Sequence, residues 1–195
     1  DNGIFWVNAA GNAARSHWQG NFYDPDGDDY HNFGGSDECN SLGVLNSGGY
    51  VTIYMTWNAW PMYPENYDLF LYNASGVKVA SSENDQDGTD YPVERIIHHV
   101  SRTEHYCLKV KDVNTSSDPE IEIFAFYEGG EPPAMEYITQ ASSIVDPGND
   151  EKVVTVGAIN ASQWGYDQEE PFSSRGPTND SLHASSRVKP DLMGP

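Results

Sequence analysis

Hydrophobic and polar residues alternate with a period of two along the middle of the chain. Residues 51–57 place Val51, Ile53, Met55 and Trp57 on one face, a pattern that predicts a half-buried β-strand. The segments 67–72 and 77–80 flank Asn73-Ala74-Ser75-Gly76 and are expected to form a hairpin. Further strands are expected at 93–100, 104–111 and 120–127. With no amphipathic helix of ten or more residues between 20 and 130, the pattern predicts an antiparallel β-sandwich or jelly roll.

The two ends of the chain carry a different pattern. Residues 4–10 begin with a run of large apolar residues and end in small ones, as expected of a buried strand. Residues 153–159 are β-branched and apolar on both faces, as expected of a buried strand in a parallel sheet. Residues 128–133 form a linker rich in Gly and Pro. We therefore predict a mainly β chain, in which a jelly-roll-like antiparallel β-sandwich is inserted between two segments of an α/β parallel sheet. The expected bounds are 1–19 and 133–195 for the sheet segments and 20–132 for the insert.

The charge of the chain narrows the classes of partner. Its 195 residues carry 30 acidic and 10 basic side chains, a formal net charge of −20. Nucleic-acid backbones and anionic membrane surfaces attract clustered Lys and Arg, so neither is an expected partner. No apolar run reaches the roughly 20 residues that a membrane span needs. The balance fits a secreted protein, a high-salt habitat or calcium binding, without choosing among them.

The chain contains two cysteines, Cys39 and Cys107. In a secreted protein they would form a disulfide that closes a long loop and stabilises the fold by about 4 kcal/mol. In a reducing compartment Cys107 is more simply a core residue of its strand. Two cysteines give no spacing pattern that separates these alternatives.

The first strand ends in small residues followed by an amide. Ala9, Ala10 and Gly11 allow another backbone to approach closely, and Asn12 follows them. Ligands of open parallel sheets bind at the carboxyl ends of strands, where an asparagine N–H can stabilise an oxyanion. A lone asparagine at a strand end is more commonly a turn residue. Both interpretations are open on these residues alone.

Four segments that follow one another along the chain favour the oxyanion interpretation of Asn12. They are the strand ending Asn8-Ala9-Ala10-Gly11-Asn12, the strand 153–158, the segment Phe172-Ser173-Ser174-Arg175-Gly176-Pro177 and the tail Val188-Lys189-Pro190-Asp191-Leu192. Together they resemble the part of a subtilisin-like serine peptidase (subtilase, peptidase S8 family) that runs from the oxyanion-hole asparagine towards the nucleophilic serine. The resemblance covers roughly the first 18 and the last 60 residues and implies that the parallel sheet is subtilisin-like.

The resemblance implies roles for the matching residues. Asn12 matches the oxyanion-hole asparagine, a catalytic group. Ala9, Ala10 and Gly11 match one wall of the primary specificity pocket. Pro147-Gly148 matches the Pro-Ala pair on the facing wall, with glycine in place of alanine.

The same resemblance implies that this chain alone is inactive. The mechanism requires a Ser, His and Asp triad, and in this family the Asp and His precede the oxyanion asparagine. Every histidine in the chain follows Asn12, and no Gly-Thr-Ser nucleophile motif occurs. Ser173 and Ser174 lack a nucleophile-elbow setting and are expected to hydrogen-bond a turn. The expected parent protein is a secreted endopeptidase that acts on polypeptides.

The insert has its own candidate chemistry. Residues 67–76 and 106–110 resemble pre-peptidase C-terminal domains, and the insertion point next to the cleft suggests that the insert gates the cleft or holds substrate. Asp24, Asp26 and Asp28 resemble the first half of a calcium loop, with a solvated acidic turn as the alternative. No other cofactor is expected. A competing function is a non-catalytic extracellular β-sandwich module that binds carbohydrate or protein.

Overall fold

The chain divides into two compact units. The computed structural model describes residues 3–162, 165, 169–179 and 186–195. One unit comprises Asp1–Arg15 and Thr139–Pro195, and the other comprises Ser16–Ile138. Regular structure in the described residues consists of strands, without helices. Accordingly, the described residues contain no helix long and apolar enough to cross a membrane.

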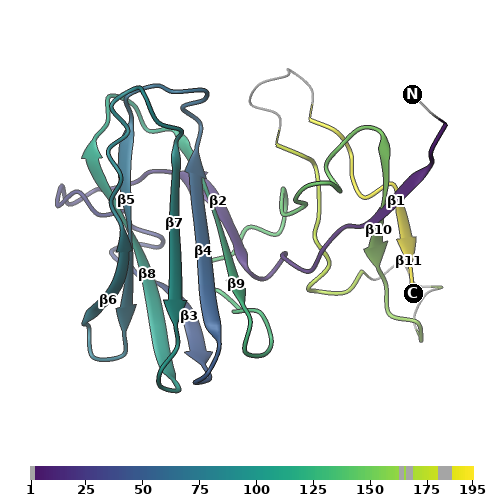
Figure 1. Cartoon of the computed structure of the whole chain (residues 1–195), viewed down its shortest axis with the longest axis horizontal. Helices are drawn as coiled ribbons and strands as arrows, with labels where there is room; N and C mark the ends of the chain where they lie inside the picture. The colour runs from purple at the N-terminus through teal and green to yellow at the C-terminus, as the bar shows by residue number, and fades with distance from the viewer. Residues whose placement is uncertain (1–2, 163–164, 166–168, 180–185) are drawn as a thin grey trace. The chain divides into compact units, whose positions relative to one another are not determined.

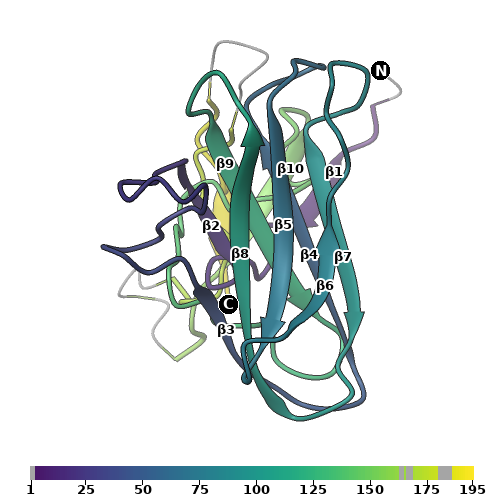
Figure 2. The same cartoon turned by 90° about the vertical axis from the view of Figure 1, so that its left-hand side faces the viewer.

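The unit Ser16–Ile138 is a β-sandwich of two four-stranded sheets (Figure 1). The first sheet has the order β2 (His17–Asn21), β9 (Glu120–Tyr127), β4 (Tyr50–Trp57) and β7 (Val93–His99). The second sheet, which faces the viewer in Figure 2, has the order β3 (Asn40–Leu45), β8 (Glu104–Asn114), β5 (Asn66–Asn73) and β6 (Lys78–Ser82). All neighbouring strands are antiparallel. The predicted mainly β fold with an antiparallel sandwich is confirmed.

The sandwich core follows the alternation of the sequence. On β4, Val51, Ile53, Met55 and Trp57 are buried, and the residues between them are more exposed. Leu and Val side chains of β5 and β8 meet Ile and Ala side chains of β9 in the same core. The Trp57 indole Nε1 donates to the Glu65 carbonyl oxygen at 2.9 Å, which satisfies its only polar group inside the core.

Two strands of the sandwich, β2 and β3, were not predicted from the sequence. β2 contains His, Trp, Gln, Gly and Asn, and β3 is interrupted by Gly43. Neither has a clean period of two, and both are held by pairing with strands distant in sequence, β9 and β8. The predicted hairpin of β5 and β6 is confirmed, and the Asn73 side chain accepts the backbone N–H groups of Ser75 and Val77 at its turn.

Cys39 and Cys107, which are 68 positions apart in the sequence, form a disulfide. Cys107 lies on the outer face of β8, with Lys109 and Lys111, whereas Leu108 and Val110 face the core. Of the two alternatives for the cysteines, the structure has the disulfide.

The other unit contains a small parallel sheet with the order β1 (Trp6–Ala9), β10 (Val153–Ala158) and β11 (Leu192–Gly194) (Figure 1). Every second residue of β10 is buried. The expectation that residues 4–10 form a buried strand is wrong: Ile4 is 80% exposed, Phe5 77% and Trp6 56%. Their backbone leads into the part of β1 that pairs with β10, but no described segment covers their side chains.

Candidate active site

Asn12 follows the carboxyl end of β1. The backbone N–H of Ala10 donates to the Val156 carbonyl oxygen at 2.8 Å, which extends the pairing with β10 by one residue. Gly11 then adopts a φ of 99°, a conformation that favours glycine, and turns the chain away from the sheet. The Asn12 side chain is exposed, and within the described residues its amide has no hydrogen-bond partner. The amide is therefore available to a ligand at this end of the sheet.

Ser174 fixes the loop that carries Asn12. Its Oγ accepts the N–H of Ala13 at 2.9 Å, and its own N–H donates to the Gly11 carbonyl oxygen at 2.9 Å. Asn12 is thus held between two residues that both bond Ser174. A Cβ on Gly11 would lie 3.1 Å from the Ser174 Oγ, so the glycine also makes room for this contact.

Ser173 has the equivalent role at the end of β10. Its Oγ accepts the N–H of Ala158 at 3.0 Å. Ser173 and Ser174 are each 1% exposed, and both hydroxyl oxygens accept backbone N–H groups. They are structural residues here, because a nucleophile must be exposed to its substrate.

Some of the residues matched to the specificity pocket lie close to one another. A Cβ on Gly148 would lie 3.4 Å from the carbonyl oxygen of Ala9, so these two small residues are neighbours. The Gly148 carbonyl oxygen accepts the hydroxyl of Thr155, a buried residue of β10. Ala10 is buried, whereas Ala9 is exposed and Pro147 half-buried. The structure therefore places the segment 147–148 beside the end of β1.

A buried lysine and an aspartate align β11 with β10. The Lys189 Nζ, on a side chain only 3% exposed, donates to the Val153 carbonyl oxygen at 2.6 Å and to Asp191 at 2.7 Å. Asp191 also accepts the N–H of Thr155 at 2.7 Å. The hydrogen bonds from Lys189 and Thr155 hold the pKa of the Asp191 carboxyl below its usual value. A Cβ on Gly176 would lie 2.4 Å from the Lys189 carbonyl oxygen, so only glycine fits there.

These contacts bring together the four segments that carried the resemblance. The Phe172–Pro177 segment bonds the loop after β1 and the end of β10, and the tail 188–192 bonds β10. The described part of this unit contains no histidine. A Ser, His and Asp triad is therefore not assembled by its described residues.

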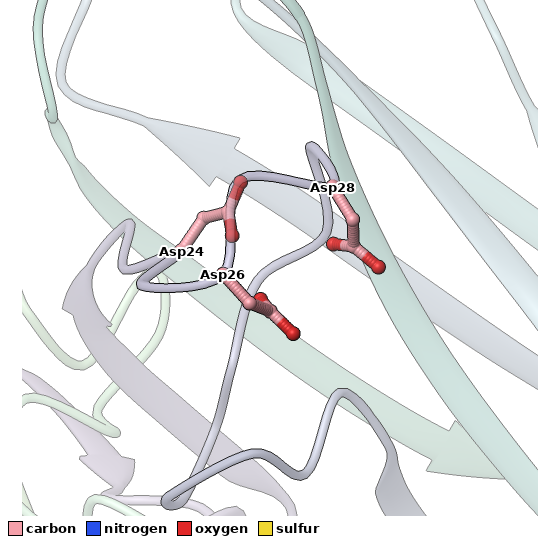
Figure 3. Close-up of side chains that lie close together, drawn as sticks. All are labelled: Asp24, Asp26 and Asp28. Atoms are coloured by element: carbon pink, nitrogen blue, oxygen red, sulfur yellow. The ribbon is translucent and has the colours of Figure 1, made fainter.

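The acidic residues lie apart from Asn12 in the sequence, on a loop of the sandwich unit between β2 and β3. Figure 3 shows Asp24, Asp26 and Asp28 on this one loop. One carboxylate oxygen from each of the three lies within 4.8 Å of the other two. The Asp24 carboxylate accepts the N–H of Gly27 at 2.7 Å and of Asp29 at 2.9 Å. The spacing of the oxygens fits a hard cation such as Ca²⁺, and hydrogen bonds within the loop already order it.

Desolvation and mutual repulsion act on these carboxyls in different ways. At Asp24, hydrogen bonds from the backbone outweigh desolvation and lower the pKa. At Asp26, desolvation, the hydrogen bond to Asp24 and the charge of Asp28 raise the pKa. A divalent cation would relieve this repulsion, because it neutralises the charges that the three side chains share.

Comparisons with known proteins identify the fold. No protein-family model and no curated protein matches the chain. Among solved structures, it is similar to the Clostridium perfringens CspB protease, with a TM-score of 0.59 and 15% identity over 98% of this chain. The chain spans 40% of the length of that protein. At this identity the likeness concerns the fold alone.

A second solved structure is a family 35 carbohydrate-binding module from Clostridium thermocellum. It has a TM-score of 0.31 and 12% identity, and the match covers 60% of this chain and 95% of that module. A similarity this low carries no argument about function.

Proposed function

We propose that this chain is part of a secreted subtilisin-like serine endopeptidase, in which Asn12 is the oxyanion-hole donor. The observation that carries the proposal is the exposed, unpartnered amide of Asn12 on a loop fixed by Ser174 at the carboxyl end of a parallel strand. A preorganised donor is the group that a developing oxyanion requires. The fold likeness to a protease supports the proposal.

Other residues complete this proposal. Ala9, Ala10 and Gly11 form one wall of the primary specificity pocket and Pro147-Gly148 the other, which their proximity supports. The triad Asp, His and Ser come from a longer polypeptide, so the present chain is inactive alone. The sandwich gates the cleft or holds the polypeptide substrate, and its acidic loop binds calcium. The Cys39–Cys107 disulfide supports an extracellular location.

The test is the substitution Asn12→Ala in the longer polypeptide that carries the triad. Loss of one oxyanion donor is expected to lower kcat by about 10²–10³, with little change in KM, because the donor acts mainly in the transition state. The matched control is Asn8→Ala, which removes a nearby half-buried amide that bonds the Ala9 carbonyl oxygen.

Equal kcat values for wild type and Asn12→Ala would refute the role of Asn12. Hydrolysis of casein by the 195-residue chain alone would contradict the proposed division of the catalytic groups.

A further inference from the structure

The outer face of the second sheet contains a cavity of about 510 Å³. Its lining combines tyrosines with polar side chains, and includes Tyr30, Tyr72, Ser41, Asn73, His105 and Lys109. We call this cavity the tyrosine pocket. It lies wholly within the sandwich, and its size is typical of small-ligand sites.

The strand register builds the floor of the tyrosine pocket. Ser41 of β3 and Tyr72 of β5 both pair with Cys107 of β8, so the three residues form one row across the sheet. Cys107 is fixed further by its disulfide to Cys39, which also lines the pocket. The floor therefore rests on three paired strands and a covalent link, and is preorganised.

Tyr30 is positioned by the loop before β3. Its backbone bridges Lys111 of β8, and the next residue, His31, donates its N–H to the Val110 carbonyl oxygen at 2.9 Å. His31 is buried in the sandwich. Since successive side chains of an extended segment point to opposite sides, Tyr30 is placed on the outer face, beside the strands that carry Tyr72.

Lys109 lies close to both rings. Its Nζ is 5.5 Å from the Tyr30 ring centroid and 5.6 Å from that of Tyr72. The Tyr30 pKa is raised by burial first and by the neighbouring Tyr72, so both the ring and its hydroxyl remain uncharged at physiological pH. Tyr30 and Tyr72 thus offer two rings, each with a hydroxyl, beside Lys109.

The charges around the tyrosine pocket favour a neutral ligand. Lys109 pairs with Glu38 at 2.8 Å, which compensates its charge. None of the described residues that line the pocket carries a carboxylate for a cation to pair with, and the ammonium of Lys109 is already paired with Glu38, which leaves an anion no unpaired lysine.

The remaining polar groups suit hydroxyls. The Ser41 Oγ accepts the N–H of Gly43 at 3.1 Å, which leaves its O–H to donate. The Asn73 Oδ1 accepts two backbone N–H groups, which leaves its NH₂ group to donate. His105 is exposed and adds an imidazole whose ring nitrogens can hydrogen-bond a ligand.

We propose that the tyrosine pocket binds a neutral saccharide. The C–H face of a sugar ring packs on a tyrosine ring, and its hydroxyls hydrogen-bond Ser41, Asn73 and His105. The residue types, the compensated charge and the preorganised floor all fit this ligand class. The site is independent of the proposed peptidase function, because none of its residues belongs to the unit that carries Asn12.

The experiment is NMR titration of the full chain with four hexameric probes: cellohexaose, maltohexaose, hexa-N-acetylchitohexaose and hexagalacturonate. We expect at least one of the three neutral probes to shift the amide signals of Tyr30, Tyr72 and His105, and hexagalacturonate to bind more weakly. Tyr72→Ala and Tyr30→Ala are each expected to weaken binding about tenfold or more, a change of about 1.4 kcal/mol. Tyr72→Phe, which keeps the ring, should retain most of the affinity.

The matched control is Tyr54→Ala, which removes an exposed tyrosine from the outer face of the other sheet and should leave binding unchanged. Melting curves of all variants separate loss of binding from loss of folding. The proposal is overturned if no neutral probe shifts these signals, if only hexagalacturonate does, or if a neutral hexapeptide shifts them and no saccharide does. Equal losses in Tyr72→Ala and Tyr54→Ala would also overturn it.

Discussion

Protonation of His31 should destabilise the sandwich below neutral pH. The side chain is 2% exposed and packs against the rings of Trp18 and Phe33, at centroid distances of 4.8 and 4.5 Å. Its Nδ1 accepts the N–H of Tyr23 at 3.0 Å, and its Nε2 has no partner among the described residues. Burial lowers the pKa of His31 from 6.5 to about 4.

The sign and size of the effect follow from this pKa difference. The folded protein holds His31 neutral, while the unfolded chain takes up a proton near pH 6.5. Stability is therefore complete above the unfolded pKa and is lost as the pH falls towards the folded pKa. The full loss is about 3 kcal/mol, of which about 2 kcal/mol is already lost at pH 5.

Protonation of Asp68 affects stability in the opposite direction, so its contribution must be separated from that of His31. Burial, with the charges of Glu83 and Glu94, raises its pKa to about 6. The folded state then binds a proton more readily than the unfolded chain, so acidification from about pH 6 stabilises the fold through Asp68. Asp68 is only half-buried, so solvent screens part of this gain. The wild-type curve alone would therefore understate the effect of His31.

The assay is urea unfolding followed by tryptophan fluorescence between pH 8 and pH 5, for wild type and His31→Asn. The asparagine oxygen can accept the Tyr23 N–H without titrating in this range. The free energy of unfolding of wild type, relative to that of His31→Asn, should fall by about 2 kcal/mol from pH 8 to pH 5. Asp68→Asn in the wild-type background should steepen the loss on acidification. Parallel curves for wild type and His31→Asn, or an imidazole pKa near 6.5 by NMR, would refute the reasoning.

Two further predictions concern the Asn12 loop and the acidic loop. Ser174→Ala leaves the buried N–H of Ala13 unpaired and should cost about 1–3 kcal/mol by thermal unfolding. Ser162→Ala, at an exposed serine of the same unit, is the control, and equal costs would contradict the role of Ser174. Calcium at 100 times its Kd should stabilise the sandwich by about 2.7 kcal/mol. Asp26→Asn should reduce this shift and magnesium should not reproduce it, while an unchanged midpoint would rule out calcium binding.

The sequence predicted best where each strand buries one face. On β4 and β9 the alternating residues decide between core and solvent, because a slip of one residue would expose a whole row of apolar side chains. The same alternation is seen on β8, where Cys107, Lys109 and Lys111 are more exposed than Leu108 and Val110. It could not place Tyr30 beside Tyr72, since that proximity depends on a loop docking against β8, and loops have no period.

The parallel unit shows why the environment of Asn12 was harder to predict than its identity. Its segments are held by polar side chains that bond backbone groups of distant residues: Ser174 to Ala13, Ser173 to Ala158 and Lys189 to Val153. Such bonds leave no periodic signal, because a single serine or lysine suffices for each. The apolar pattern at residues 4–7 predicted burial and was misleading, since these side chains are exposed. The position of Asn12 depends on the polar contacts, so perturbing Ser174 tests the site more directly than perturbing the strand.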